Sequence, residues 1–144
     1  MASALRYRLA EGVCMDATGA NRNHPKRALL IDDDKGVRNA LHDVVTSFGF
    51  VTDAAANGPE GLALFEKNPY DVVLTDLLMP GMTGWEVLQA LRRLDPKIPV
   101  VIVTGASVWA DDYGILQPAV ALVRKPVDMR VLETALSRLL GGLA

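Results

Sequence analysis

Four short apolar runs along the chain each end in polar side chains. The runs are Ala28–Ile31, Val72–Leu74, Val100–Val103 and Val120–Val123. They lead into Asp32–Asp33–Asp34, Thr75–Asp76, Thr104–Gly105 and Arg124–Lys125–Pro126, respectively. Apolar runs that do not alternate with polar residues are typical of strands buried on both faces. The pattern therefore predicts parallel strands whose polar ends share one edge of a sheet.

Between these runs, apolar residues recur at the three-to-four spacing of an amphipathic helix. The first such segment carries Val37, Leu41, Val45 and Phe48, and Gly49 is placed to end it. Three further helices are predicted from a proline in a first turn, a capping box and an N-cap. These signals are Pro59 before Leu62 and Phe65, Thr83 with Glu86, and Asp128 before a stripe that ends at Gly141–Gly142.

Alternating strands and helices predict an α/β fold, a three-layer sandwich of five strand–helix units around a parallel sheet. The second strand is expected at Phe50–Ala54, where Asp53 would stand near its end. The segment from Ser107 to Pro118 has a weaker pattern, and we expect a short helix there.

The length of 144 residues suits one domain with a core of its own. Residues 1–25 lack periodicity and are expected to be a flexible N-terminal extension, which leaves residues 26–144 for the domain. Residues 1–27 carry five Lys/Arg and two Asp/Glu, so the remaining body is acidic and shows no basic patch for nucleic acid. With a single cysteine, Cys14, and no spanning apolar run, we expect a cytoplasmic protein without membrane contact.

Candidate chemistry lies at the carboxyl ends of the strands, where open α/β sheets bind ligands. That rule selects five side chains: Asp32, Asp33, Asp76, Thr104 and Lys125. Crowded carboxylates favour a hard divalent cation, and Mg²⁺ fits best because it shares its ligands with phosphate oxygens, although Mn²⁺ could substitute. An ammonium and a hydroxyl beside the metal indicate a phosphoryl site in which Asp76 could act as the nucleophile.

These residues resemble the receiver domain of two-component response regulators, of the chemotaxis-regulator type, over about Lys26 to Leu140. Four family features occur in order on matching elements. They are the acidic pair Asp32–Asp33, the phosphoacceptor Asp76 in Asp-Leu-Leu-Met-Pro-Gly-Met-Thr-Gly, Thr104, and Lys125–Pro126.

The resemblance implies a flavodoxin-like sheet of order 2-1-3-4-5 and phosphorylation of Asp76 by a histidine kinase or a histidine phosphotransfer protein. It also implies that Mg²⁺ is held by Asp33, Asp76 and the backbone carbonyl of Leu78, and by Asp32 through water, while Thr104 and Lys125 bind phosphoryl oxygens. The bond before Pro126 is expected to be cis. Such a domain signals through a protein-interaction face and is not an enzyme that turns over a substrate.

Two departures from the family pattern bear on how phosphorylation would be signalled. In the family, a Tyr or Phe often stands three residues before the Lys and moves inward when the Thr meets the phosphoryl group. This chain has Leu122 at that position, so the aromatic part of this conformational switch is missing. Leu78 and Ala106 flank the expected water approach and are apolar, so we hypothesise that they alter the lifetime of the acyl phosphate.

Three other functions compete with this interpretation. A dehalogenase-type phosphohydrolase needs a second Asp where this chain has Leu78, and a flavodoxin-like carrier needs a phosphate loop that Asp32–Asp33–Asp34 would repel. A receiver-like interaction module that works without phosphorylation is the stronger alternative. No output domain follows Leu140 in this sequence, so a stand-alone receiver and one excised from a longer regulator or hybrid kinase are both expected possibilities.

Overall fold

Five parallel strands form one sheet in the computed structural model, which describes residues 25–105 and 119–141. In sheet order the strands are β2 (Val51–Ala55), β1 (Arg27–Ile31), β3 (Val72–Asp76), β4 (Val100–Thr104) and β5 (Val120–Arg124). This order, 2-1-3-4-5, confirms the predicted topology. The inner strands are buried on both faces as predicted, whereas the edge strands β2 and β5 are partly exposed.

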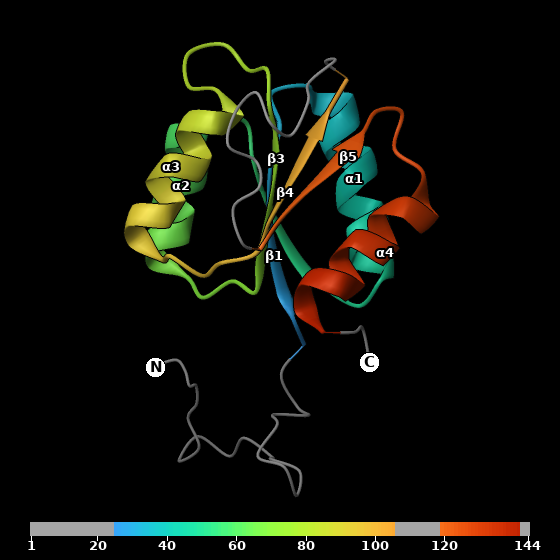
Figure 1. The fold of residues 1–144 in the computed structure, drawn as a ribbon. Coiled ribbons are helices and arrows are strands. Elements are labelled where there is room, and N and C mark those ends of the chain that lie inside the picture. The colour runs from blue at the N-terminus through green and yellow to red at the C-terminus, as the bar shows by residue number, and fades with distance from the viewer. Residues whose placement is uncertain (1–24, 106–118, 142–144) are drawn as a thin grey trace, which may run out of the picture.

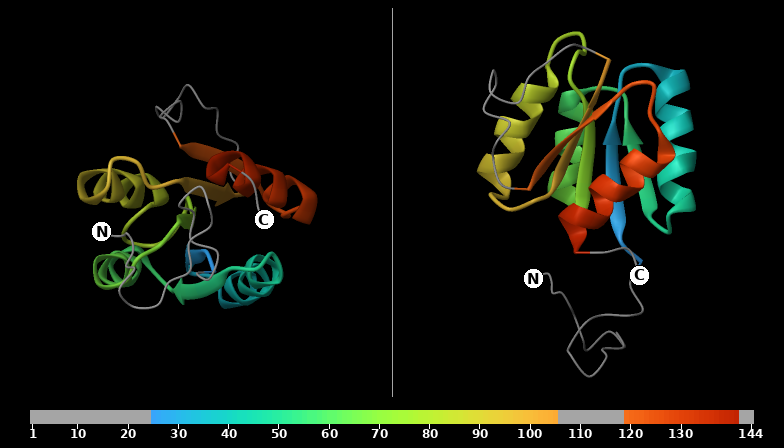
Figure 2. Two further views of the ribbon diagram at one scale, coloured as in Figure 1. Left: turned by 90° about the horizontal axis from the view of Figure 1, so that it is seen from below. Right: turned by 45° about the vertical axis from the view of Figure 1, so that its right-hand side comes forward.

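Helices cover both faces of the sheet, which confirms the predicted three layers (Figures 1 and 2). One face packs against α2 (Gly58–Lys67) and α3 (Gly84–Leu94), and the other against α1 (Lys35–Ser47) and α4 (Met129–Leu140). Alternate residues of each inner strand enter opposite cores. In β1, Leu29 and Ile31 face α2 and α3, while Ala28 and Leu30 face α1 and α4.

The local signals in the sequence begin and end the helices as predicted. Thr83 and Glu86 form a capping box at α3, Asp128 caps α4, and Gly141 ends α4 in the left-handed conformation at φ 74°. Asp34, an exposed residue in the turn after β1, also caps α1 by accepting the amide of Val37 at 3.0 Å.

Three expectations concern residues that the structure does not describe. Of the flexible extension expected at residues 1–25, only Pro25 is among the described residues. The short helix expected between Ser107 and Pro118 lies wholly outside them. Ala106 is outside them as well. Among the helices that are described, none has the length and apolar character needed to cross a membrane.

Candidate functional site

Asp76 is the last residue of β3 and is almost fully buried, with 7 % of its surface exposed. Its Oδ1 accepts the amide of Leu77 at 2.8 Å. The hydroxyl of Thr75 donates to the Asp76 carbonyl at 3.0 Å. Backbone and side chain are thus both held, and the carboxylate is fixed at the carboxyl edge of the sheet.

The start of α3 packs directly on the backbone of Asp76. A Cβ built on Gly84 would overlap the Asp76 carbonyl oxygen and lie 2.8 Å from the Leu77 Cα. The amide of Gly84 donates to the Leu77 carbonyl at 2.8 Å. Because only glycine permits this approach, α3 can begin against the strand end that carries Asp76.

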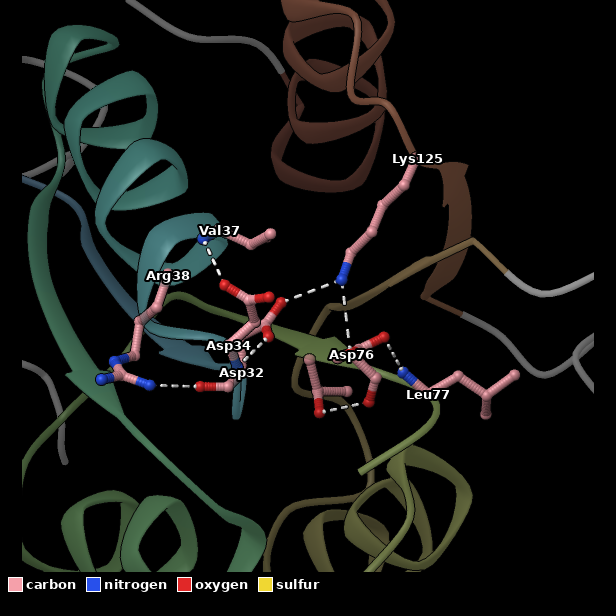
Figure 3. Close-up of polar contacts among 8 residues, drawn as sticks. Asp32, Asp34, Val37, Arg38, Asp76, Leu77 and Lys125 are labelled. Atoms are coloured by element: carbon pink, nitrogen blue, oxygen red, sulfur yellow. Dashed lines mark hydrogen bonds and ion pairs between the residues drawn. The ribbon is translucent and has the colours of Figure 1, made fainter. Parts of the chain in front are cut away.

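Lys125, which follows β5, joins Asp76 at the end of β3 to Asp32 after β1 (Figure 3). Its Nζ lies 3.1 Å from Asp32 Oδ2 and 3.3 Å from Asp76 Oδ2. Asp32 is almost fully buried at 1 % exposure, so its negative charge depends on nearby positive groups and donors. One ammonium therefore serves two buried carboxylates.

The surroundings shift the pKa values of Asp76 and Lys125. Burial raises the pKa of Asp76, the charge of Lys125 opposes that rise, and the charge of Asp32 adds to it. Burial disfavours the charge of Lys125, but its bonds and ion pairs with Asp32 and Asp76 outweigh this effect and raise the Lys125 pKa.

Asp33 completes a cluster of three carboxylates with Asp32 and Asp76. One oxygen from each lies within 4.8 Å of the others, and Asp33 itself is exposed to solvent. Lys125 provides one positive charge to three negative ones, so the cluster is short of positive charge. Carboxylate oxygens that converge from two strand ends are suitable ligands for Mg²⁺, which also keeps waters and phosphate oxygens in its shell.

Thr104 and Leu78 occupy the positions expected from the sequence. Thr104 is the last residue of β4, is 1 % exposed, and accepts the amide of Lys125 at its carbonyl at 2.9 Å. Leu78 follows Asp76 by two residues, and 62 % of its surface is exposed. The peptide bond between Lys125 and Pro126 is cis, as expected. The roles of Thr104 and of the Leu78 carbonyl as phosphoryl and metal ligands stay predictions.

The contacts of two polar side chains were not predicted from the sequence. The guanidinium of Arg38 on α1 donates to the Asp32 carbonyl at 2.7 Å. Asp53, expected near the end of its strand, instead lies in the middle of β2, because the strand extends to Ala55. Its carboxylate accepts from Arg27 at 2.9 Å and from Tyr70 at 2.6 Å.

Comparison with known proteins places the chain among signalling domains. A sequence profile of the response regulator receiver domain matches residues 28–137. The transcriptional regulatory protein AfsQ1 of Streptomyces coelicolor is 34% identical over 122 residues, covering 78% of this chain and 50% of AfsQ1. The sensor histidine kinase RcsC of Salmonella typhimurium is 32% identical over 119 residues, covering 82% of this chain and 13% of RcsC. The chain thus spans half or less of these relatives.

Solved structures agree with this result. The chemotaxis protein CheY4 of Vibrio cholerae matches with a TM-score of 0.75 and 28% identity, over 81% of this chain and 100% of CheY4. The response regulator TrrA of Thermotoga maritima, solved in complex with Mg²⁺–BeF, matches with a TM-score of 0.74 and 30% identity, over 80% of this chain and 99% of TrrA. Both matches cover about four fifths of this chain and nearly all of the solved chain.

Proposed function

The chain belongs to the family of response regulator receiver domains, and from that premise we propose that it accepts a phosphoryl group on Asp76. The donor is the phosphohistidine of a histidine kinase or of a histidine phosphotransfer protein, and the reaction depends on Mg²⁺. One observation carries the proposal. A nearly buried carboxylate at a strand end is bonded to a lysine and converges with two further carboxylates.

Bound Mg²⁺ would neutralise the carboxylates and the incoming phosphoryl oxygens. Asp33, Asp76 and the backbone carbonyl of Leu78 would hold it directly, and Asp32 largely through water. Mn²⁺ would serve in the same place. The donor set supports this assignment because it consists of oxygen atoms only, with a deficit of positive charge.

In the transfer step, a carboxylate oxygen of Asp76 forms a bond to phosphorus while the P–N bond of the phosphohistidine breaks. The electron pair of that bond returns to the imidazole, which takes up a proton. The product is an acyl phosphate on Asp76. Lys125, whose Nζ already lies 3.3 Å from Asp76 Oδ2, and the Thr104 hydroxyl would bind the phosphoryl oxygens.

The receiver unit in this proposal comprises residues 26–144, with residues 1–25 as an extension. Its output would pass through a protein-interaction face to a downstream protein, in the cytoplasm and without direct contact with nucleic acid. The relatives include both a transcriptional regulator and a sensor kinase, so either kind of larger protein is compatible with this domain.

The decisive experiment incubates the protein with Mg²⁺ and acetyl phosphate and measures its intact mass. We expect the mass of one added phosphoryl group in the parent. The adduct should be absent in Asp76→Asn and after chelation of Mg²⁺. Asp43→Asn is a matched control, because Asp43 is an exposed carboxylate on α1, and it should be modified like the parent. Failure of the parent to form an adduct with any phosphodonor would overturn the proposal and favour the phosphorylation-independent interaction module.

A further inference from the structure

We propose that Arg38 is a positioning residue for the metal and phosphoryl site, because it fixes the turn that carries the acidic pair. The inference rests on the proposed function of that site. Figure 3 shows the Arg38 side chain reaching back from α1 to the backbone of Asp32, on the side of the turn away from Lys125. Arg38 would act through Asp32 and Asp33 and would touch neither metal nor phosphoryl group.

Three hydrogen bonds close a circuit around the turn between β1 and α1, and a fourth caps α1. Arg38 Nη1 donates to the Asp32 carbonyl at 2.7 Å, and the Asp34 amide donates to Asp32 Oδ1 at 2.9 Å. Asp34 in turn caps α1 through the Val37 amide, and the Arg38 amide donates to the Asp34 carbonyl at 2.8 Å. The circuit thus begins and ends at Arg38 and includes both neighbours of Asp33.

Asp33 has the greatest need of such support. Asp32 is buried and bonded to Lys125 and to the Asp34 amide, whereas Asp33 is exposed. Among the described residues, no hydrogen bond or ion pair of the Asp33 side chain is seen. The direction of its carboxylate therefore depends on the backbone on either side, which the Arg38 circuit restrains. A site held in its binding geometry loses less entropy when a ligand arrives.

Charge alone predicts the opposite effect of Arg38. A positive guanidinium near a cation site repels Mg²⁺, so removing it should tighten metal binding if long-range electrostatics dominate. If the bond to the Asp32 carbonyl dominates, removing it should weaken metal binding, because the turn and Asp33 lose their restraint. The two explanations thus differ in the sign of the change.

The test compares Arg38→Gln with Lys35→Gln by titrating Mg²⁺ into each protein in an isothermal calorimeter. Lys35 is the first residue of α1 and is exposed, and its side chain makes no hydrogen bond within residues 25–105 and 119–141. It therefore reports the effect of removing a nearby charge. Arg38→Lys keeps the charge but not the planar group that reaches the carbonyl, and it serves if Arg38→Gln folds poorly.

We expect the Mg²⁺ dissociation constant to rise at least threefold in Arg38→Gln and to rise less in Arg38→Lys, and to stay level or fall in Lys35→Gln. In phosphorylation by acetyl phosphate, the Mg²⁺ concentration for half-maximal rate should rise in Arg38→Gln while the rate at saturating Mg²⁺ stays near that of the parent. An Arg38→Gln protein that binds Mg²⁺ as tightly as the parent, or more tightly, would overturn the inference. A parent that forms no adduct would instead overturn the proposed function.

Discussion

At the scale of single residues, Leu78 bears on the lifetime of the proposed acyl phosphate. It stands two residues beyond Asp76, the proposed phosphoacceptor, and 62 % of its surface is exposed, so it lies against solvent without a polar side-chain atom to hold a water. A hydrolytic water near the acyl phosphate would have to be positioned by other groups. The side chain at this position is therefore expected to influence how long Asp76 stays phosphorylated.

Leu78→Asn should release phosphate from phosphorylated Asp76 faster than the parent. The amide can hold one water, and a hydrogen bond contributes about 0.5–1.5 kcal/mol, which corresponds to roughly a two- to tenfold change in rate. Phosphate release is followed after removal of the phosphodonor. Leu78→Met, which keeps an apolar side chain of similar size, should behave like the parent. Equal release rates for all three proteins would refute the role assigned to Leu78.

A second residue-scale prediction concerns Tyr70, whose hydroxyl donates to Asp53 on the edge strand β2. Burial, the bond to Asp53 and the charge of Asp53 raise the pKa of Tyr70 from 10.0 to about 12. The unfolded chain loses this proton first, so the stabilisation is complete below pH 10 and is lost as the pH rises towards 12. Because Tyr70 is only half-buried, we expect about 1 kcal/mol rather than the full value of the shift.

Urea unfolding of the parent and of Tyr70→Phe measures this contribution. The parent should be more stable by about 1 kcal/mol at pH 8, and the difference should shrink between pH 10 and 12. Because alkali affects both proteins alike, the difference in unfolding free energy between the parent and Tyr70→Phe isolates the contribution of the hydroxyl. A difference that is independent of pH would show that the hydroxyl contributes through something other than its proton.

At the scale of elements, the sequence predicted what depends on neighbours along the chain. Apolar runs located the inner strands, and the Thr83–Glu86 and Asp128 signals located the starts of α3 and α4. The bonds of Asp53 to Arg27 and Tyr70 depend instead on strand register, which places Asp53 beside Leu29. Strand register depends on the packing of whole elements, so no local sequence pattern predicts that Asp53 contacts Arg27 and Tyr70.

The contact of Arg38 escaped prediction for a different reason. Its acceptor is a backbone carbonyl, and every residue of the chain offers one. An ion pair with a carboxylate could have been predicted from the opposite charges, but a hydrogen bond to a backbone carbonyl involves no particular residue type and cannot be predicted from the sequence. The sequence could therefore select candidate site residues by their distinctive chemistry, whereas a residue that supports them through a backbone carbonyl could not be selected in this way.

The junction of α3 with β3 yields a prediction about Gly84. In Gly84→Ala, the new methyl group would meet the backbone of Asp76 and Leu77, which cannot move aside as a flexible side chain could. We expect the free energy of unfolding to fall by about 1–3 kcal/mol, because overpacking outweighs the better helix propensity of alanine. Urea denaturation at neutral pH provides the measurement.

Gly36→Ala is the matched control for this substitution. Gly36 lies in the first turn of α1, and a Cβ there would be 3.4 Å from Asp34 Oδ1, close to ordinary contact. This variant should be as stable as the parent or more stable, by up to about 1 kcal/mol. Similar losses in the two variants would mean that the close approach of α3 to Asp76 is not what requires glycine.

At the scale of the whole molecule, strand order explains why the acidic residues meet. The chain runs from β1 outward to β2, returns across β1 to β3, and continues to β4 and β5. The direction of winding reverses between β1 and β3, and the loops after these two strands diverge towards opposite faces of the sheet. Asp32 and Asp33 follow β1 and Asp76 ends β3, so the reversal brings three carboxylates together in one place.

This concentration of negative charge at one end of the fold opposes folding until a cation neutralises it. Mg²⁺ that binds only the folded chain should raise the free energy of unfolding, by about 2.7 kcal/mol at a concentration 100 times its dissociation constant. Thermal unfolding in MgCl₂, compared with NaCl of equal ionic strength, measures the effect. Most of the rise should disappear in Asp33→Asn, while Asp43→Asn, which removes an exposed carboxylate from α1, should keep it. In Mg²⁺-free buffer Asp33→Asn should be at least as stable as the parent, because the substitution removes repulsion between carboxylates.

An equal effect of Mg²⁺ on the stability of all three proteins would indicate general ionic screening and not a site formed where the winding of the sheet reverses.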